Sequence, residues 1–292
     1  MKQDALLAEA REFQTKRHLG QNFLVDCPTL DIIAGLLDLS QGDRVVEIGA
    51  GIGFLTRILA ASGASITAVD LDVECTDYLE SLELGNVEIL HGDFLRFDLS
   101  SLTFFTDRRN ENLSKCREGG RKPKVIGNVP YQITGRIIAH LLGEIGQPAP
   151  WFKDIERIVL TVQLEVARRM VACAGEEDYS RLSLLIAYFC QASLEAVVDR
   201  QCFYPSPEVT SAIVRLTPLK QPGVTCKNHI LLRQLIEAGF RQRRKMLRNS
   251  LSFLKLGPQE LGRVFASVNF DPQVRAERLS LQQFAKLADA LS

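Results

Sequence analysis

An apolar strand that runs into a glycine-rich turn and then a helix constrains the fold of this chain more than any other stretch. Residues 45–60, VVEIGAGIGFLTRILA, place Gly49, Gly51 and Gly53 between a β-branched run and an amphipathic pattern. Glycine lets the backbone turn sharply there and approach a ligand with no Cβ in the way. A strand, turn and helix of this kind is typical of the first βα unit of an open α/β sheet.

Further short apolar runs alternate with helical patterns, which predicts βαβ units around a mostly parallel sheet and so an α/β fold class. The seven expected strands are residues 44–49, 65–70, 87–92, 124–129, 157–163, 194–199 and 211–217. No long helical pattern separates the last two runs. We therefore expect them to form an antiparallel pair at one edge of the sheet.

Two stretches interrupt this alternation. Residues 99–123 are polar, charged and rich in Asn, Ser and Gly, which predicts a long surface loop or insertion. After TPLKQPG at 217–223 the patterns are helical throughout. We therefore expect a first domain over residues 1–219 and a small, all-helical second domain over residues 220–292.

The composition argues against several classes of protein. With 35 basic and 35 acidic residues, the chain lacks the basic excess of most nucleic-acid binders. It has no apolar run long enough to span a membrane and no signal-peptide pattern at its start. Its seven scattered cysteines form no CxxC pair, and its four histidines have no paired spacing. We expect a cytoplasmic protein with free thiols, no membrane contact and no metal.

Acidic residues follow the next two expected strands. Asp70 ends the second strand and Asp93 follows the third, so both are expected at the edge where the glycine turn lies. A carboxylate at Asp70 can accept hydrogen bonds from both ribose hydroxyls of a nucleoside. Phe54 stands where a dinucleotide fingerprint has its third glycine, which favours S-adenosylmethionine over NAD. A turn that serves only the fold is the alternative.

The fourth expected strand ends in residues 125–135, VIGNVPYQITG, a pattern that suits an amine on an aromatic ring. The side-chain oxygen of Asn128 and the carbonyl of Val129 can accept the two N6 hydrogens of adenine, which frees the nitrogen lone pair. Pro130 fixes the turn, and Tyr131 can stack on the base. Because a sulfonium methyl is already activated, placement and electrostatics would suffice without a strong base. A plain strand end and helix start is the alternative.

Basic residues gather in two segments of the chain. Arg241, Arg244, Lys245 and Arg248 recur at helical spacing, which predicts one cationic helix face that contacts RNA phosphates. A solvated helix face is the alternative. Residues 108–124 hold seven basic residues against two acidic ones, and disorder suits them as well as RNA contact does.

Six ordered motifs carry a resemblance that covers nearly the whole chain. They are HLGQNFLVD at 18–26, VVEIGAGIGFLT at 45–56, GNVPYQIT at 127–134, FYPSPEVTSAIVRL at 203–216, FRQRRKMLRNSL at 240–251 and RAERLS at 275–280. The sequence resembles the rRNA adenine N6-dimethyltransferase family, most closely its bacterial small-subunit members. The resemblance implies a monomeric class I (Rossmann-like) methyltransferase that transfers four methyl groups from S-adenosylmethionine. The acceptors would be two adjacent adenosines in the 3′-terminal hairpin of 16S rRNA, during small-subunit maturation.

The same resemblance implies the site residues. Cofactor contacts fall on Asn22, Leu24, Gly49, Gly51, Asp70, Asp93 and Asn128. Phe203 would close over the flipped target base opposite Tyr131, with a core position as the alternative. The chain departs from the family at Asp70, where glutamate is more common, and at Leu164 and Ser180, where lysine and glycine are usual.

Three rival functions stay open. The first is a large-subunit rRNA adenine methyltransferase of the antibiotic-resistance type, which the C-terminal motifs disfavour. The second is a ribosome-assembly or transcription factor that kept the fold without the chemistry. The intact glycine turn and the segment 128–131 argue against it. The third is a DNA adenine methyltransferase, disfavoured because no target-recognition domain is apparent.

Overall fold

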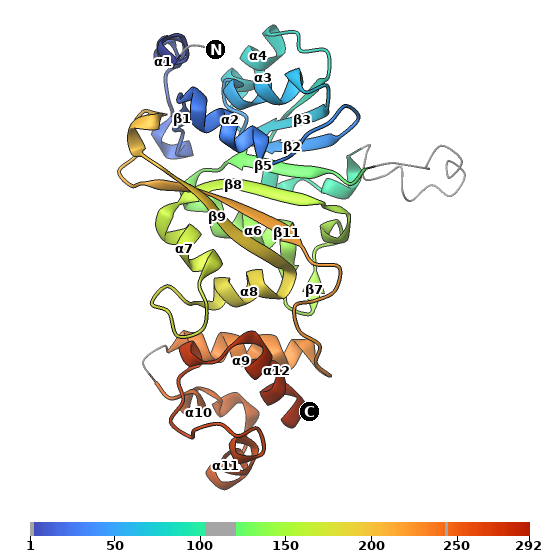
Figure 1. Cartoon of the computed structure of the whole chain (residues 1–292), viewed down its shortest axis with the longest axis vertical. Coiled ribbons are helices and arrows are strands. Elements are labelled where there is room, and N and C mark those ends of the chain that lie inside the picture. Colours follow the sequence, from blue (N-terminus) through green and yellow to red (C-terminus); the bar gives the residue numbers. More distant parts are fainter. Residues whose placement is uncertain (1–2, 103–120, 243–244) are drawn as a thin grey trace, which may run out of the picture. The chain divides into compact units, whose positions relative to one another are not determined.

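The structure is a computed structural model that describes residues 3–102, 121–242 and 245–292 (Figure 1). Most of the predicted loop at 99–123 therefore lies outside the described residues. By internal contacts the chain divides into two units. Unit 1 comprises Met1–Leu141, Pro150–Ala167 and Ser193–Pro218, and unit 2 comprises Leu142–Ala149, Arg168–Ala192 and Leu219–Ser292. Unit 2 thus includes earlier segments than the expected second domain, and a domain boundary near residue 220 stays a prediction.

The predicted sheet has seven strands. They are β2 (Arg44–Ile48), β3 (Ser65–Asp70), β4 (Val87–His91), β5 (Lys124–Asn128), β8 (Arg157–Gln163), β9 (Cys190–Val198) and β11 (Ser211–Pro218). Their order is β4-β3-β2-β5-β8-β11-β9. From β4 to β8 all neighbours run parallel, whereas β11 runs antiparallel to β8. The mostly parallel sheet with an antiparallel strand near one edge is confirmed.

Two pairs of short strands lie outside this sheet. The strands β1 (Phe23–Leu24) and β10 (Phe203–Tyr204) are antiparallel, and so are β6 (Gly143–Glu144) and β7 (Gln147–Pro148). The β1–β10 pair joins the N-terminal segment to the chain just before β11. This join matters for the site, because the residues before β1 reach the carboxyl edge of the sheet.

Two of the helices between the strands, α2 and α4, begin at a capping carboxylate. The first helices are α1 (Gln3–Glu12), α2 (Cys27–Gly35), α3 (Phe54–Ala61), α4 (Val73–Ser81), α6 (Thr134–Leu142) and α7 (Leu164–Val171). Asp26 accepts the backbone N–H of Thr29 at 3.0 Å to begin α2, and Asp72 accepts that of Glu74 at 3.1 Å to begin α4. Leu30, Ile33 and Leu59 are buried with Val45 and Ile66 of the sheet in one hydrophobic core.

Unit 2 is mainly helical. It contains α8 (Arg181–Phe189), α9 (His229–Arg241), α10 (Leu247–Ser250), α11 (Pro258–Ser267) and α12 (Leu281–Ala290). Its core buries Leu235 of α9 and Phe284 of α12 completely. A Cβ on Gly239 would lie 2.8 Å from the Cβ of Ala276 and 3.0 Å from Leu247. Glycine at position 239 therefore allows Ala276 and Leu247 to pack directly against α9.

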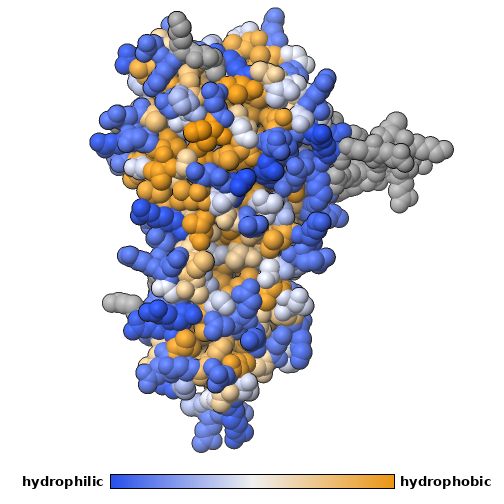
Figure 2. Space-filling view, viewed as in Figure 1, coloured by the Kyte–Doolittle hydropathy of each residue, from blue (hydrophilic) through white to orange (hydrophobic). Residues whose placement is uncertain are grey.

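The surface mixes polar and apolar side chains. Figure 2 shows hydrophilic residues interspersed with hydrophobic ones over the face drawn. In the described part of the chain no helix is long and apolar enough to cross a membrane. Within the same ranges, no cluster of His, Cys, Asp or Glu side chains has the grouping of a metal site.

Candidate active site

A cavity of about 300 Å³ opens in unit 1 at the edge where the parallel strands end. It is lined by Ile48, Gly49 and Gly51 after β2, Val69–Leu71 after β3, Gly92–Phe94 after β4, Asn128–Ile133 after β5, and His18–Phe23. Ligands of open α/β sheets bind at this edge, and the volume lies at the lower end of the range for small-molecule sites. All the predicted cofactor residues except Leu24 line it: Asn22, Gly49, Gly51, Asp70, Asp93 and Asn128.

The glycine turn has a conformation that other residues avoid. Gly49, Gly51 and Gly53 have φ angles of 71°, 55° and 84°, in the left-handed region where a side chain causes strain. A Cβ on Gly51 would also lie 3.0 Å from the ring of Phe23, which lines the same cavity. The turn therefore presents bare backbone to the cavity.

Asp70 connects the glycine turn to the start of α4. Its Oδ2 accepts the backbone N–H of Gly51 at 2.7 Å, and its Oδ1 accepts that of Asp72 at 2.8 Å. Burial raises the pKa of Asp70, and these backbone hydrogen bonds oppose the shift. Both oxygens are thus fixed at the cavity wall, each with lone-pair capacity left for ribose hydroxyls.

The next two predicted residues also contribute to the wall. Asp93 begins a short 3₁₀ helix by accepting the backbone N–H of Leu95 at 3.0 Å. The Asn22 side chain donates to the carbonyl of Gly20 at 3.1 Å, which shapes the turn that precedes β1. Each side chain is held by local backbone, so its position depends little on distant packing.

The Asn128 amide has a defined orientation. Its Nδ2 donates to the backbone carbonyl of Asn22 at 2.9 Å. The acceptor Oδ1 therefore points away from that carbonyl, and it is the acceptor that the chemistry of an adenine amine requires. Pro130 and the buried Val129 follow, and a Cβ on Gly49 would lie 3.9 Å from Cδ of Pro130, at ordinary contact distance.

Tyr131 is held by its hydroxyl. The phenol oxygen lies 2.5 Å from Oγ of Ser211, the first residue of β11. Burial raises the pKa of Tyr131, so the phenol is neutral. With its far end fixed, the ring presents a stable face to the cavity that it lines.

Leu24 and Phe203 were predicted at the site but do not line this cavity, and Leu24 instead lines a small pocket together with Gly49, Gly51 and Asn128. They pair in register across β1 and β10 and are 4% and 3% exposed. Both belong to the hydrophobic core of unit 1, and neither lines the cavity. The pairing turns the Phe203 ring toward the core, as in the core alternative. A role for Phe203 over a target base stays a prediction.

Comparison with known proteins identifies the family. Residues 12–292 match the ribosomal RNA adenine dimethylase family. The chain belongs to this family. It is 40% identical over 279 residues to a protein of Pelotomaculum thermopropionicum named ribosomal RNA small subunit methyltransferase A, covering 94% of this chain and 90% of the relative. A protein of the same name from Nostoc is 36% identical, covering 94% and 97%.

Solved structures agree with the family. A 23S rRNA methyltransferase, ErmE, aligns with a TM-score of 0.66 and 25% identity over 92% of this chain and 99% of that one. A dimethyladenosine transferase from Plasmodium falciparum aligns with a TM-score of 0.70 and 24% identity over 90% and 94%. The fold is that of a class I methyltransferase, and the family makes the chain an rRNA adenine methyltransferase.

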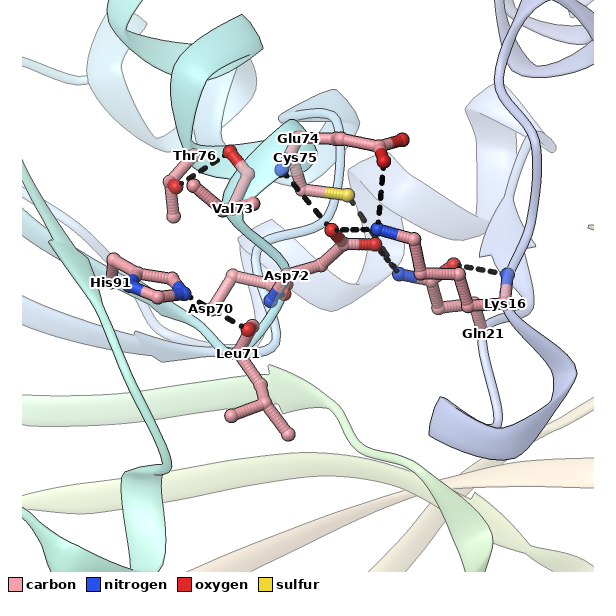
Figure 3. A network of polar contacts seen from close by, with 10 residues as sticks. All are labelled: Lys16, Gln21, Asp70, Leu71, Asp72, Val73, Glu74, Cys75, Thr76 and His91. Atoms are coloured by element: carbon pink, nitrogen blue, oxygen red, sulfur yellow. Dashed lines mark hydrogen bonds and ion pairs between the residues drawn. The ribbon is translucent and has the colours of Figure 1, made fainter.

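A polar network that the sequence did not predict ties the N-terminal segment to the cavity wall (Figure 3). Asp72 accepts hydrogen bonds from Nζ of Lys16 at 2.6 Å and from Nε2 of Gln21 at 2.7 Å. Lys16 also lies 3.1 Å from a carboxylate oxygen of Glu74. Asp72 is 4% exposed and follows Asp70 by two residues. The sequence motifs did not single it out.

The prediction that these basic residues share one face of a single helix is wrong. Helix α9 ends at Arg241, and the extended backbone of Met246 separates it from α10, where Arg248 lies. Leu247, the first residue of α10, is fully buried and packs near Gly239 of α9. Arg241, Lys245 and Arg248 are all exposed, whereas Arg244 lies outside the described residues. Their contact with RNA stays a prediction.

Proposed function

We propose that this protein transfers methyl groups from S-adenosylmethionine to N6 of two adjacent adenosines in the 3′-terminal hairpin of 16S rRNA. Four transfers would leave both adenosines dimethylated. The small-subunit target is supported by relatives at 36–40% identity that carry the name ribosomal RNA small subunit methyltransferase A. The reaction would be a step in the maturation of the small ribosomal subunit.

The orientation of the Asn128 amide is the observation that carries this proposal. Its donor side is engaged by the carbonyl of Asn22, so its oxygen is the group available to an exocyclic amine. Together with the carbonyl of Val129, that oxygen would accept both N6 hydrogens and make the nitrogen pyramidal. Tyr131 would hold the base by stacking. The chain needs no strong base, because the proton can leave after methyl transfer.

The residues of the cavity fit a nucleoside cofactor. When bound, S-adenosylmethionine supplies a methyl group already activated by its sulfonium charge. Asp70 would accept from the ribose hydroxyls, and the bare glycine turn would allow close approach of the cofactor. Asp93 and Asn22 would contact its polar groups. These residues bind and align the reactants, which is the main contribution that such a transfer requires.

The test uses unmethylated small ribosomal subunits, the purified protein and S-adenosylmethionine with a labelled methyl group. Nucleoside analysis should find the label in N6,N6-dimethyladenosine at two adjacent positions near the 3′ end of the RNA. Large-subunit RNA, offered in parallel, should remain unlabelled. Label in the large subunit alone would assign the chain to the antibiotic-resistance type, and no label with cofactor bound would leave a non-catalytic role.

A further inference from the structure

Unit 2 contains a second cavity that the proposed reaction does not use. It holds about 340 Å³ and lies beside α9. One wall is formed by Gln234, Glu237, Ala238 and Arg241, whose spacing of i, i+3, i+4 and i+7 makes them one face of the helix. Facing them are Gln242, Asn249, Ser250, Ser252 and Phe253. The volume again lies at the lower end of the range for small-molecule sites.

Several polar groups of this cavity are available to a ligand. The side chains of Gln234, Arg241, Gln242 and Asn249 have no hydrogen-bond or ion-pair partner among the residues that the structure describes. Their donors and acceptors are therefore open to a ligand in the cavity.

The chemistry of the lining points to a base attached to a phosphate backbone. Amide side chains offer donors and acceptors side by side, as the edges of nucleobases do. The ring of Phe253 is 42% exposed and provides a face on which a base can stack. The cation of Arg241 suits a phosphate. Glu237, which pairs with Arg181 at 3.6 Å, makes the cavity a poor site for a free anion.

We propose that this cavity binds an unpaired nucleobase of the RNA substrate, stacked on Phe253 and contacted at its edge by the amides. The proposal rests on the proposed function, since it takes RNA as the substrate. It gives unit 2 a specific role beyond general attraction of phosphates. RNA that offers an unpaired nucleotide would then bind more tightly than a continuous duplex.

The experiment measures the Kd for unmethylated 16S rRNA freed of ribosomal proteins. Phe253→Ala should weaken binding about tenfold, the effect of losing one stacked base, and Phe253→Trp should restore it. Asn249→Ala should weaken binding as well. Leu256→Ala is the matched control, because Leu256 is 39% exposed, lies in the same segment and does not line this cavity. S-adenosylmethionine binding, measured by calorimetry, should stay unchanged in every variant.

Three outcomes would overturn the proposal. The first is equal RNA affinity for Phe253→Ala and Leu256→Ala. The second is a weakening seen with intact subunits and absent with protein-free RNA, which would assign the cavity to a ribosomal protein. The third is an absence of RNA binding by the wild-type chain. Methylation of subunits by the wild-type chain reports on the proposed function separately, so the two failures are distinguishable.

Discussion

The side chain of Asn128 lies where the backbone of the N-terminal segment meets the end of β5. A single hydrogen bond, from Nδ2 to the carbonyl of Asn22, fixes the orientation of the side-chain amide and so the direction in which its acceptor oxygen points. An aspartate there would keep an acceptor and lose this donor, whereas an alanine would lose both. Asn128 therefore links the N-terminal segment that lines the cavity to the proposed chemistry.

Substituting Asn128 with alanine should lower the rate of methylation by roughly 100-fold or more, the cost of removing one preorganised hydrogen-bonding group from a transition state. RNA affinity should not change, because the predicted phosphate contacts lie at other residues. Single-turnover assays with unmethylated subunits measure the rate, and filter binding measures the affinity. Wild-type rates in Asn128→Ala would refute the proposed role of the amide.

Glu47 is a second residue whose protonation state follows from its burial. It is 2% exposed within β2, and its Oε2 has no hydrogen-bond partner among the described residues. Burial, with a smaller effect from the charge of Asp70, raises the pKa of Glu47 from 4.5 to about 8. Glu47 is therefore protonated in the folded protein at neutral pH.

Protonation of Glu47 predicts a pH-dependent stability. Between about pH 4.5 and pH 8 the unfolded chain loses this proton and the folded chain keeps it, so the free energy of unfolding should fall as the pH rises. The slope from this site can reach about 1.4 kcal/mol per pH unit. Urea titrations across that range should show the slope, and Glu47→Gln should reduce it. Glu88→Gln, which removes an exposed carboxylate from β4, is the control. An identical slope in Glu47→Gln and the wild-type chain would contradict the assignment.

At the scale of elements, the N-terminal segment covers the cavity through the Asp72 network. Lys16 and Gln21 come from one segment, and Asp72 comes from the start of α4. Burial raises the pKa of Asp72, but hydrogen bonds from Lys16 and Gln21 outweigh this effect and keep it below its usual value. The carboxylate therefore stays ionised, and the contact persists at mildly acidic pH.

Replacing Lys16 with methionine should release the segment while keeping its apolar stem. We expect cofactor to dissociate several-fold faster and the chain near residue 16 to be cleaved more readily by protease. Stopped-flow displacement of S-adenosylmethionine measures the first effect, and limited proteolysis with mass spectrometry measures the second. Arg11→Met, which replaces an exposed cation on α1, is the matched control. Equal dissociation rates in the two variants would show that the network does not hold the segment.

The basic segment between α9 and α10 gives a prediction at the same scale. Charge reversal at Arg244 and Lys245 should weaken RNA binding. It should also lower the salt dependence of that binding, by roughly one unit of slope for each phosphate that the two side chains neutralise. Affinity for S-adenosylmethionine should not change. Binding titrations at several salt concentrations measure both quantities. Unchanged RNA affinity would favour the solvated-surface interpretation.

At the scale of the whole molecule, a buried ion pair joins the two central strands at the edge opposite the cavity. Nζ of Lys124, at the start of β5, donates to Asp43 just before β2 at 2.9 Å and to the carbonyl of Asp38 at 2.8 Å. Asp43 is fully buried and also accepts from Arg121 at 2.9 Å. Burial raises the pKa of Asp43, but these two cations hold it below its usual value. The stability that they contribute is present above the pKa of the unfolded chain and is lost as the pH falls through the folded value.

Lys124→Met should destabilise the fold by about 3–5 kcal/mol, because it leaves the Asp43 carboxylate buried with less compensation. The double variant with Asp43→Leu should recover much of this stability, since it removes the buried charge as well. Lys122→Met, which changes an exposed lysine two residues away, is the control. Urea denaturation measures all three. A Lys124→Met chain as stable as Lys122→Met would show that the pair contributes nothing to stability.

The sequence was sufficient for the sheet and for most of the cavity. Strand ends at residues 48, 70 and 128 follow from apolar runs bounded by glycine or polar residues, so Asp70 and Asn128 could be placed at one edge without coordinates. The basic segment could not be placed in this way. Its helical spacing continued through residue 248, whereas α9 ends at Arg241 and Leu247 packs near Gly239 in the core of unit 2.

What the sequence determined by itself was local: periodicity, turn chemistry and the order of motifs depend on residues close together in the chain. The tertiary structure alone decided that Lys16 meets Asp72, that Asn22 orients Asn128, and that Phe203 packs into the core. These contacts join residues far apart in the chain, and the hydrophobic burial that drives them has no direction. Their geometry therefore depends on how the whole core packs.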